Sequence, residues 1–328
     1  MNRSEALIER NTNGINIIKF LRNNINLCAL IVLLIIGTLA SDSFLQPGNV
    51  LNVLKFISIN GIVAAGFTVV CLSGGFDLSL GSTVSVCACL FMGLQKTSGI
   101  GAAIVFSLLA GAAFGLFNGT LLRITKGDLG DTFLITLGTS LIGQSIAYTY
   151  SKGYNIYADD SFSPVYRFIG HGEVLGIPMP IVIMATIMIF LQFLLKKTSF
   201  GREIYLIGGN KVTSYMSGIN VHTYKTIAFM IAGMCAATAA MILTSRTTAA
   251  SPRSGFGYDF DAAIAAVIGG NRVGGGRGGL AHTFIGAVIF GVLTNIMNLL
   301  NINPVLQMII KGVMLVLALL ADNLREKN

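Results

Sequence analysis

Long apolar runs separated by short polar stretches dominate the chain. Because a membrane-spanning helix needs about 20 largely apolar residues, the pattern predicts about ten transmembrane segments. Two of them, 81–95 and 258–270, are short, and we expect such pieces to be half-helices or re-entrant elements shielded by protein or a water-filled cavity. The predicted segments are residues 26–42, 49–72, 81–95, 100–122, 132–150, 177–195, 224–244, 258–270, 281–300 and 304–321.

The composition agrees with this pattern. Apolar residues make up 53% of the 328 residues and charged residues only 11%, against roughly 25% charged in a soluble domain. Most of the surface must therefore face lipid, and the fold class is all-α integral membrane, a polytopic helical bundle. The predicted organisation is a cytoplasmic or interfacial N-terminal tail (1–25), a transmembrane domain (26–322) and a short C-terminal tail (323–328).

The net charge of +8 is better explained by the orientation of the chain in the membrane than by nucleic-acid binding. With the N-terminus inside, fifteen Lys and Arg residues fall in predicted inside segments and five in outside segments. Basic residues are retained on the cytoplasmic side of membrane proteins, so both termini are predicted to be cytoplasmic. The long loop 151–176 is then periplasmic, and the loop 196–224 is cytoplasmic.

The segment Ser73–Ser82, SGGFDLSLGS, interrupts two apolar runs. Paired glycines permit positive φ or close backbone approach, and an ionised carboxylate such as Asp77 is costly at membrane depth unless it is paired or wet. Ser79 and Asp77 can also cap the start of the next helix. Two readings therefore stay open: a capped break between two helices, or a part of a transport path or gate.

The inner loop contains a short helix signal. Asn210 is a good N-cap and Gly218 a good C-terminal stop, with about two helical turns between them. So short a helix has little stability alone and needs a docking surface. Because exposed connectors rarely need residues such as Tyr215 and Met216, we favour docking onto a partner protein.

The glycine-rich run 269–279 does not form a nucleotide-binding loop, because it lacks the Gly-Lys-Ser/Thr sequence and a preceding strand. An inward-facing basic turn fits it better. A shift of 195 positions superimposes three glycines of 74–81 on this run, which weakly suggests an internal repeat. We also expect Arg246 and Arg253 to neutralise Asp259 and Asp261 around the eighth segment.

The sequence resembles the permease subunits of bacterial ABC importers for monosaccharides, of the ribose/xylose/galactose type. Three blocks carry the resemblance, and apolar segments in matching order join them, so that it covers nearly the whole chain. These blocks are SGGFDLSLGS at 73–82, GREIYLIGGNKVTSYMSGINV at 201–221 and DAAIAAVIGGNRVGGGRGGLAHTFIGAV at 261–288.

The resemblance implies partners and roles. It implies ABC ATPase subunits, a periplasmic or lipid-anchored substrate-binding protein, and a second permease copy in a homodimer or heterodimer. No cofactor is expected on this chain, since ATP and Mg belong to the partner ATPase. Candidates for coupling to the ATPase are Gly208, Gly209, Asn210, Tyr215, Ser217 and Gly218. Candidates for the translocation path or gate are Gly74, Gly75, Asp77, Ser79 and Gly81.

Other cargoes and machines are the alternatives. Related ABC permeases carry nucleosides or branched-chain amino acids. An ion-coupled secondary transporter would work without an ATPase, and a passive channel would need no energy source. An enzyme is the least favoured reading, because no hydrolytic or redox motif is present in the sequence.

Overall fold

A computed structural model of the chain describes residues 25–159 and 162–326, with side chains described for 26–159 and 162–320. The predicted tail at 1–24 and residues 327–328 lie outside this part. Twelve helices account for nearly all of the regular structure in the described residues. They are α2 (Ile25–Ala40), α3 (Pro47–Leu72), α4 (Leu80–Thr125), α5 (Leu129–Ser151), α6 (Pro164–His171), α7 (Met179–Lys197), α8 (Ser199–Gly209), α9 (Lys211–Met216), α10 (Val221–Thr247), α11 (Tyr258–Gly269), α12 (Leu280–Leu299) and α13 (Pro304–Glu326).

Four strands of two residues each complete the described elements. They are β1 (Ile156–Tyr157), β2 (Glu173–Val174), β3 (Ile177–Pro178) and β4 (Ala249–Ala250). β1 pairs with β4, and β2 pairs with β3, both antiparallel. An all-helical fold is therefore confirmed, and the short strands serve only to connect helices.

A helix covers each of the ten predicted apolar segments. α4 covers two of them, because its 46 residues divide at Gly99, whose φ of 80° is not helical. Within the described residues, α3, α4, α7, α10 and α12 are long and apolar enough to cross a membrane. α11 has only 12 residues, as the half-helix prediction requires.

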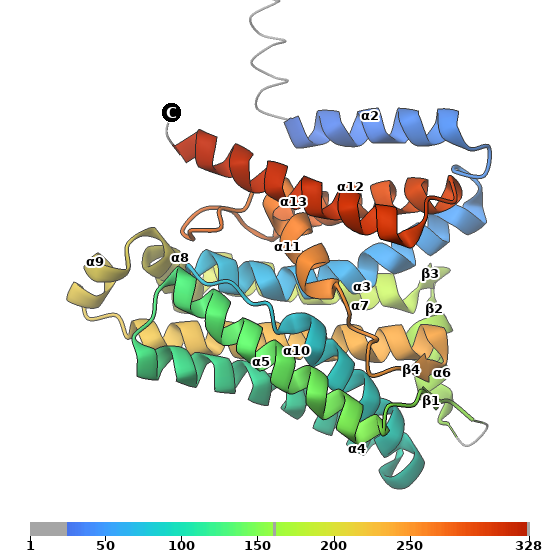
Figure 1. Ribbon diagram of the computed structural model, residues 1–328, viewed down its shortest axis with the longest axis horizontal. Helices are drawn as coiled ribbons and strands as arrows, with labels where there is room; N and C mark the ends of the chain where they lie inside the picture. Colours follow the sequence, from blue (N-terminus) through green and yellow to red (C-terminus); the bar gives the residue numbers. More distant parts are fainter. Residues whose placement is uncertain (1–24, 160–161, 327–328) are drawn as a thin grey trace, which may run out of the picture.

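Most of the helices run side by side, with α11 set between them (Figure 1). α3 and α10 form the centre of the bundle, and every residue of α3 from Ile57 to Leu72 is buried. α8 and α9 lie at one end of the bundle, and all four strands with α6 lie at the other. The two loops predicted to face opposite sides of the membrane therefore occupy opposite ends.

Glycines allow α4 and α10 to approach each other closely. A side chain at Gly111 would overlap the Gly233 carbonyl oxygen, and a side chain at Gly233 would overlap that of Gly111. Close approach of this kind increases van der Waals packing where lipid supplies no hydrophobic drive between helices. Gly111 and Gly233 therefore set the short separation between α4 and α10.

The loop 151–176 is tied to the end of α10 through Tyr166. This residue is 1% exposed, and its hydroxyl donates a 2.7 Å hydrogen bond to the carbonyl of Thr244. The Ser245 hydroxyl in turn donates to the carbonyl of Tyr166. The first of these bonds satisfies a carbonyl that the last turn of α10 would otherwise leave unpaired.

Replacing Tyr166 by Phe should therefore loosen this loop. The substitution leaves the buried Thr244 carbonyl without its donor, which costs about 1–3 kcal/mol. We expect a lower thermal unfolding midpoint for purified protein and faster proteolysis within 151–176. Tyr154→Phe is the matched control, since Tyr154 is 75% exposed and should change neither measurement. Equal behaviour of the two variants would contradict this account.

Candidate functional site

The segment between α3 and α4 is an extended break whose backbone is satisfied by α5. The amides of Phe76 and Leu78 donate to the hydroxyls of Thr132 and Thr136, each at 3.0 Å. Unpaired amides inside a membrane cost several kcal/mol each, so the two threonines make the break possible. They also fix its position against α5.

Asp77 caps the start of α4. Its carboxylate accepts the amide of Ser79 at 2.8 Å and the Ser79 hydroxyl at 2.6 Å, and the Asn118 amide donates to that hydroxyl at 2.8 Å. Asp77 and Ser79 are each 1% exposed. This geometry agrees with the capped-break reading, while a role of either residue in gating stays a prediction.

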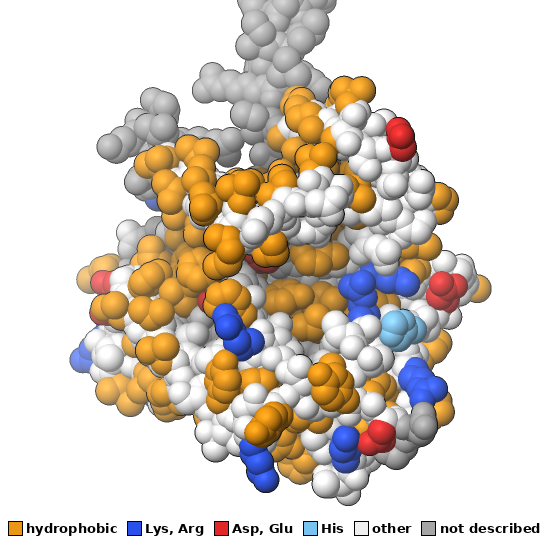
Figure 2. All heavy atoms as spheres, turned by 45° about the vertical axis from the view of Figure 1, so that its right-hand side comes forward, with side chains coloured by type: hydrophobic (Ala, Val, Ile, Leu, Met, Phe, Trp, Pro, Cys, Tyr) orange, Lys and Arg blue, Asp and Glu red, His pale blue; other side chains and the backbone are white. Residues whose placement is uncertain are grey.

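A cavity of about 790 Å³ opens between α5 and α13. Its floor is formed by residues 253–261, that is, the end of the segment that connects β4 to α11 and the first turn of α11, and a hollow with acidic atoms is visible on this face in Figure 2. Of the five path candidates, Gly81 alone lines it. The polar and aromatic residues of the lining are Ser82, Ser140, Gln144, Tyr148, Arg253, Phe256, Asp259, Phe260, Asp261, Gln307 and Lys311.

The two breaks cross at the edge of this cavity. A side chain at Gly81 would come within 2.8 Å of the Gly255 carbonyl oxygen, and one at Gly255 would overlap the carbonyl of Gly81. The Gly255 amide also donates to the Ser85 hydroxyl at 2.9 Å. The first turn of α4, directly after the break, and the segment that follows α10 are therefore in direct backbone contact.

An ion pair joins α11 to α13 in the cavity wall. The ammonium of Lys311 lies 2.9 Å from each carboxylate oxygen of Asp261 and 5.1 Å from the centre of the Phe290 ring. The expected pairing of Asp261 with Arg246 or Arg253 is wrong, since the guanidinium of Arg253 lies over the Phe256 ring at 4.7 Å. α13 therefore packs closely enough against α11 for Lys311 to pair with an acid 50 positions earlier in the sequence.

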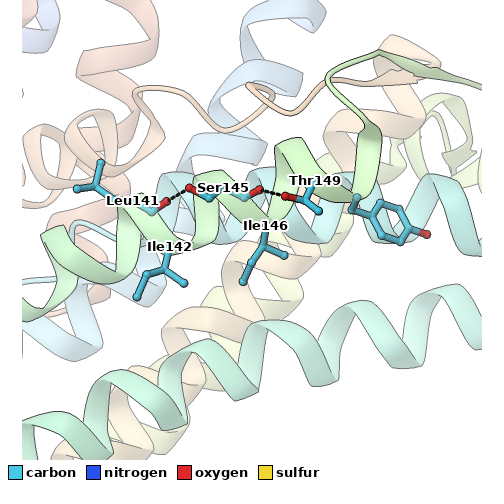
Figure 3. A pocket seen from close by; sticks show the side chains of 6 residues that line it. Leu141, Ile142, Ser145, Ile146 and Thr149 are labelled. Atoms are coloured by element: carbon cyan, nitrogen blue, oxygen red, sulfur yellow. Dashed lines mark hydrogen bonds between the residues drawn. The ribbon is translucent and has the colours of Figure 1, made fainter.

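A second, shallower depression lies on the outer face of α5 (Figure 3). Two of its hydroxyl groups are already used, because Ser145 donates to the carbonyl of Leu141 and Thr149 to that of Ser145, both at 2.9 Å. The face is otherwise mostly apolar, with Leu141, Ile142 and Ile146 as a surface for lipid or protein.

The predicted short helix in loop 196–224 is present as α9. The Asn210 side chain accepts the amide of Thr213 at 3.0 Å, and Gly218 has the positive φ of 82° expected of a helix stop. Tyr215 is 71% exposed and Met216 83% exposed, so their apolar surfaces are not used inside this chain. α9 is the element farthest out at its end of the bundle (Figure 1).

Lys211 attaches α9 to the turn between α4 and α5. Its ammonium donates to the carbonyls of Lys126 and Gly127 and to the Asp128 carboxylate, the last at 2.6 Å. The hydrogen bond and charge of Lys211 lower the pKa of Asp128, so this ion pair persists at neutral pH and weakens only on acidification.

Gly208 places the end of α8 against both glycine-rich breaks. A side chain at Gly208 would overlap the Leu72 carbonyl oxygen and the Gly276 amide, which are themselves joined by a 3.1 Å hydrogen bond. Gly275 packs in turn against the backbone of Gly74. We name this contact of 72–74, 208–209 and 275–276 the glycine junction. Through it, the segment that carries α9 touches both breaks.

Comparison with known proteins now identifies the family. Residues 49–319 match the family model described as the permease component of the branched-chain amino acid transport system. The chain belongs to this permease family. The match covers every long apolar helix of the described structure, and it confirms the expectation of a transport component in the cytoplasmic membrane rather than an enzyme.

Several curated relatives are similar over most of their length. The ribose import permease protein RbsC of Haemophilus influenzae is 36% identical, over 97% of this chain and 98% of the relative. RbsC of Bacillus subtilis is 39% identical, over 89% of this chain and 90% of the relative. The D-allose transport system permease protein AlsC of Escherichia coli is 32% identical over 90% of each. No solved structure matches the chain.

The sequence did not reveal the cavity lining. Asp259 was expected only to neutralise an arginine, and Gln144, Gln307 and Lys311 were not singled out. These residues come from α5, α11 and α13, which are far apart in the sequence. Of Gln144, Gln307 and Lys311, only Lys311 could have been found from the sequence, because a cation inside an apolar segment marks a candidate functional residue.

The glycine junction gives a paired prediction. Gly208→Ala forces a methyl group into the Leu72 carbonyl, and overpacking of this kind costs roughly 1–3 kcal/mol. Gly209→Ala is the control, because its Cβ would meet nothing within 4 Å. We expect thermal unfolding of the purified protein to shift downward for Gly208→Ala only. Equal unfolding midpoints for the two variants would show that the glycine junction accommodates the added methyl group with no loss of stability.

Proposed function

We propose that this protein is the permease subunit of an ABC importer that carries a monosaccharide, of the ribose type, into the cell. The similarity to the ribose and allose permeases along nearly the full chain carries this proposal. The cavity between α5 and α13 supports it, because a solute with many hydroxyl groups needs hydrogen-bonding partners where lipid offers none, and a few polar side chains line this cavity. ATP hydrolysis belongs to a partner chain.

The membrane topology we propose has ten crossings, with both termini in the cytoplasm. α4 contributes two of these crossings on either side of Gly99, and α11 contributes a short one. The domain 26–322 then carries the coupling loop 196–224 inside and the loop 151–176 outside. The excess of basic residues in the inside segments supports this orientation.

The cavity would be the outward-facing part of the path. Its lining comes from the second half of α5 and the first half of α13, the halves nearest the end of the bundle that holds the strands. A polar cavity open toward lipid would be costly, so we propose that a second permease copy covers the open side between α5 and α13. A periplasmic or lipid-anchored binding protein would deliver the sugar there.

Coupling to the ATPase would act through α9. The exposed apolar residues Tyr215 and Met216 suit a groove on a partner, and Asn210 and Gly218 hold the helix that presents them. Movement of α9 would reach the breaks through the glycine junction and shift the permease pair between outward-facing and inward-facing states. Gly208 and Gly209 would act here as the hinge, and Gly74 and Gly75 as its contact on the first break.

A second cargo class is supported by one observation, the description of the matching family as branched-chain amino acid permeases. The related nucleoside permeases would use the same machine. An ion-coupled secondary transporter would instead need no ATPase. These alternatives differ in substrate or energy source, so uptake measurements separate them.

The test of cargo is competition for uptake. Cells that depend on this permease, its ATPase and its binding protein should accumulate labelled ribose, with inhibition by excess ribose, xylose or galactose but not by leucine or adenosine. A strain lacking the ATPase should lose uptake to background. Inhibition by leucine or adenosine, or uptake without the ATPase, would overturn the monosaccharide importer.

The test of coupling uses substitutions at α9. Gly218→Pro cannot adopt φ of 82°, and Tyr215→Glu places a charge on the apolar docking face, so both should abolish most ATP-driven uptake while membrane insertion is retained. Tyr215→Phe keeps the aromatic face and should transport at close to the normal rate. Normal uptake by Gly218→Pro and Tyr215→Glu would remove α9 from the coupling mechanism.

A further inference from the structure

The cavity between α5 and α13 has the size and lining of a small-molecule site. Its volume of about 790 Å³ falls in the range of roughly 300–1,000 Å³ common for ligand sites. Most of the lining is apolar, and a few carboxylate, amide and basic groups converge on it. Sites of this type use the few polar groups to orient the ligand and to select it.

Asp259 stands out among these groups because it carries an unneutralised charge. Within the described residues, no basic side chain lies at ion-pair distance from its carboxylate, whereas Asp261, two positions on, is paired with Lys311. A carboxylate at membrane depth needs water or a polar ligand to replace its lost hydration.

Asp77 shows by contrast what a structural carboxylate looks like in this fold. It lies in the segment between α3 and α4, is 1% exposed, and accepts hydrogen bonds from the amide and hydroxyl of Ser79. Asp259 instead lines the cavity, where Gly81 leaves room beside it: a side chain at Gly81 would come within 3.2 Å of its carboxylate oxygen. The two acids therefore differ in what their oxygens can reach.

The surroundings of Asp259 suit a sugar better than a metal ion. A carboxylate has about four acceptor positions and no donor, so it can accept bonds from more than one hydroxyl group at once. Phe256 and Phe260, on either side of Asp259 in the sequence, both line the cavity and provide apolar faces for the C–H surface of a sugar ring. Arg253 and Lys311 also line it, and their positive charges disfavour a bound cation.

We propose that Asp259 accepts hydrogen bonds from hydroxyl groups of the transported monosaccharide in this cavity and thereby selects which sugars pass through the permease. The proposal rests on the monosaccharide importer proposed above and adds a specificity-determining residue to it. A site built to hydrogen-bond a hydroxyl discriminates against an analogue that lacks it, because the buried polar group is then left unpaired.

The test combines substitution of the residue with deletion of single hydroxyl groups from the sugar. Complete importer, with permease, ATPase and binding protein, is reconstituted in liposomes, and uptake of ribose and of each monodeoxy ribose is measured at concentrations that saturate the binding protein. Asp259→Asn removes the charge at nearly constant size, and Asp259→Glu keeps the charge. Glu173→Gln, an exposed residue of β2, makes the same carboxyl-to-amide change outside the cavity.

We expect the wild-type importer to favour ribose over at least one deoxy analogue by roughly ten-fold, the value of a hydrogen bond to a charged acceptor. Asp259→Asn should lose most of that preference for the same analogue, while Asp259→Glu retains part of it and Glu173→Gln all of it. A residue with a merely structural role would lower uptake of every sugar by one common factor and leave the preference unchanged.

Two results would overturn the assignment. One is an Asp259→Asn importer that matches the wild type for every sugar, and the other is a variant that is slower for all sugars in the same proportion. The proposed function fails in a different way, because a wild-type importer that takes up no monosaccharide would show this before any variant is compared. Equal thermal stability of the purified variants excludes a folding defect as the cause of altered preference.

Discussion

Every backbone polar group inside the membrane must find a partner within the protein, and this constraint shapes the centre of the molecule. Unbroken helices meet it automatically, but three segments leave the helical path: 73–79, 248–257 and 270–279. Each is satisfied by side chains from elsewhere in the fold. Thr132 and Thr136 accept amides of the first segment, Ser85 accepts an amide of the second, and the Tyr205 hydroxyl donates to the Gly278 carbonyl in the third.

The same three segments form part of the cavity and of the glycine junction. Where a helix is interrupted, polar atoms and narrow glycine backbones can be presented at a depth that ordinary spans keep apolar. The segment before α11 and the first turn of α11, which carries Asp259, form the floor of the cavity, while the other two segments meet α8 at the glycine junction. The interruptions thus connect the cavity between α5 and α13 to the end of the bundle where α9 lies.

The local parts of this arrangement could be predicted from the sequence, and the long-range parts could not. Apolar runs predicted every long helix, and Asn210 and Gly218 predicted both ends of α9, because each signal lies within the element that it specifies. The pairing of Asp261 with Lys311 depends on how α11 and α13 pack, which no local pattern contains. The shift of 195 positions places Gly74 on Gly269, whereas in the folded chain Gly74 is in contact with Gly275, which the suggested repeat does not pair with it.

α10 runs without interruption from the loop 196–224 to β4, over 27 residues or about 40 Å. Its first residues follow α9, and its last carbonyls are held by Tyr166 of the loop at the opposite end. A stiff rod of this length transmits a tilt rather than absorbing it, so that a rotation of about 5° at one end displaces the other by roughly 3 Å. The binding protein proposed to act on the loop 151–176 and the ATPase proposed to act on α9 would therefore exert force at opposite ends of the same helix.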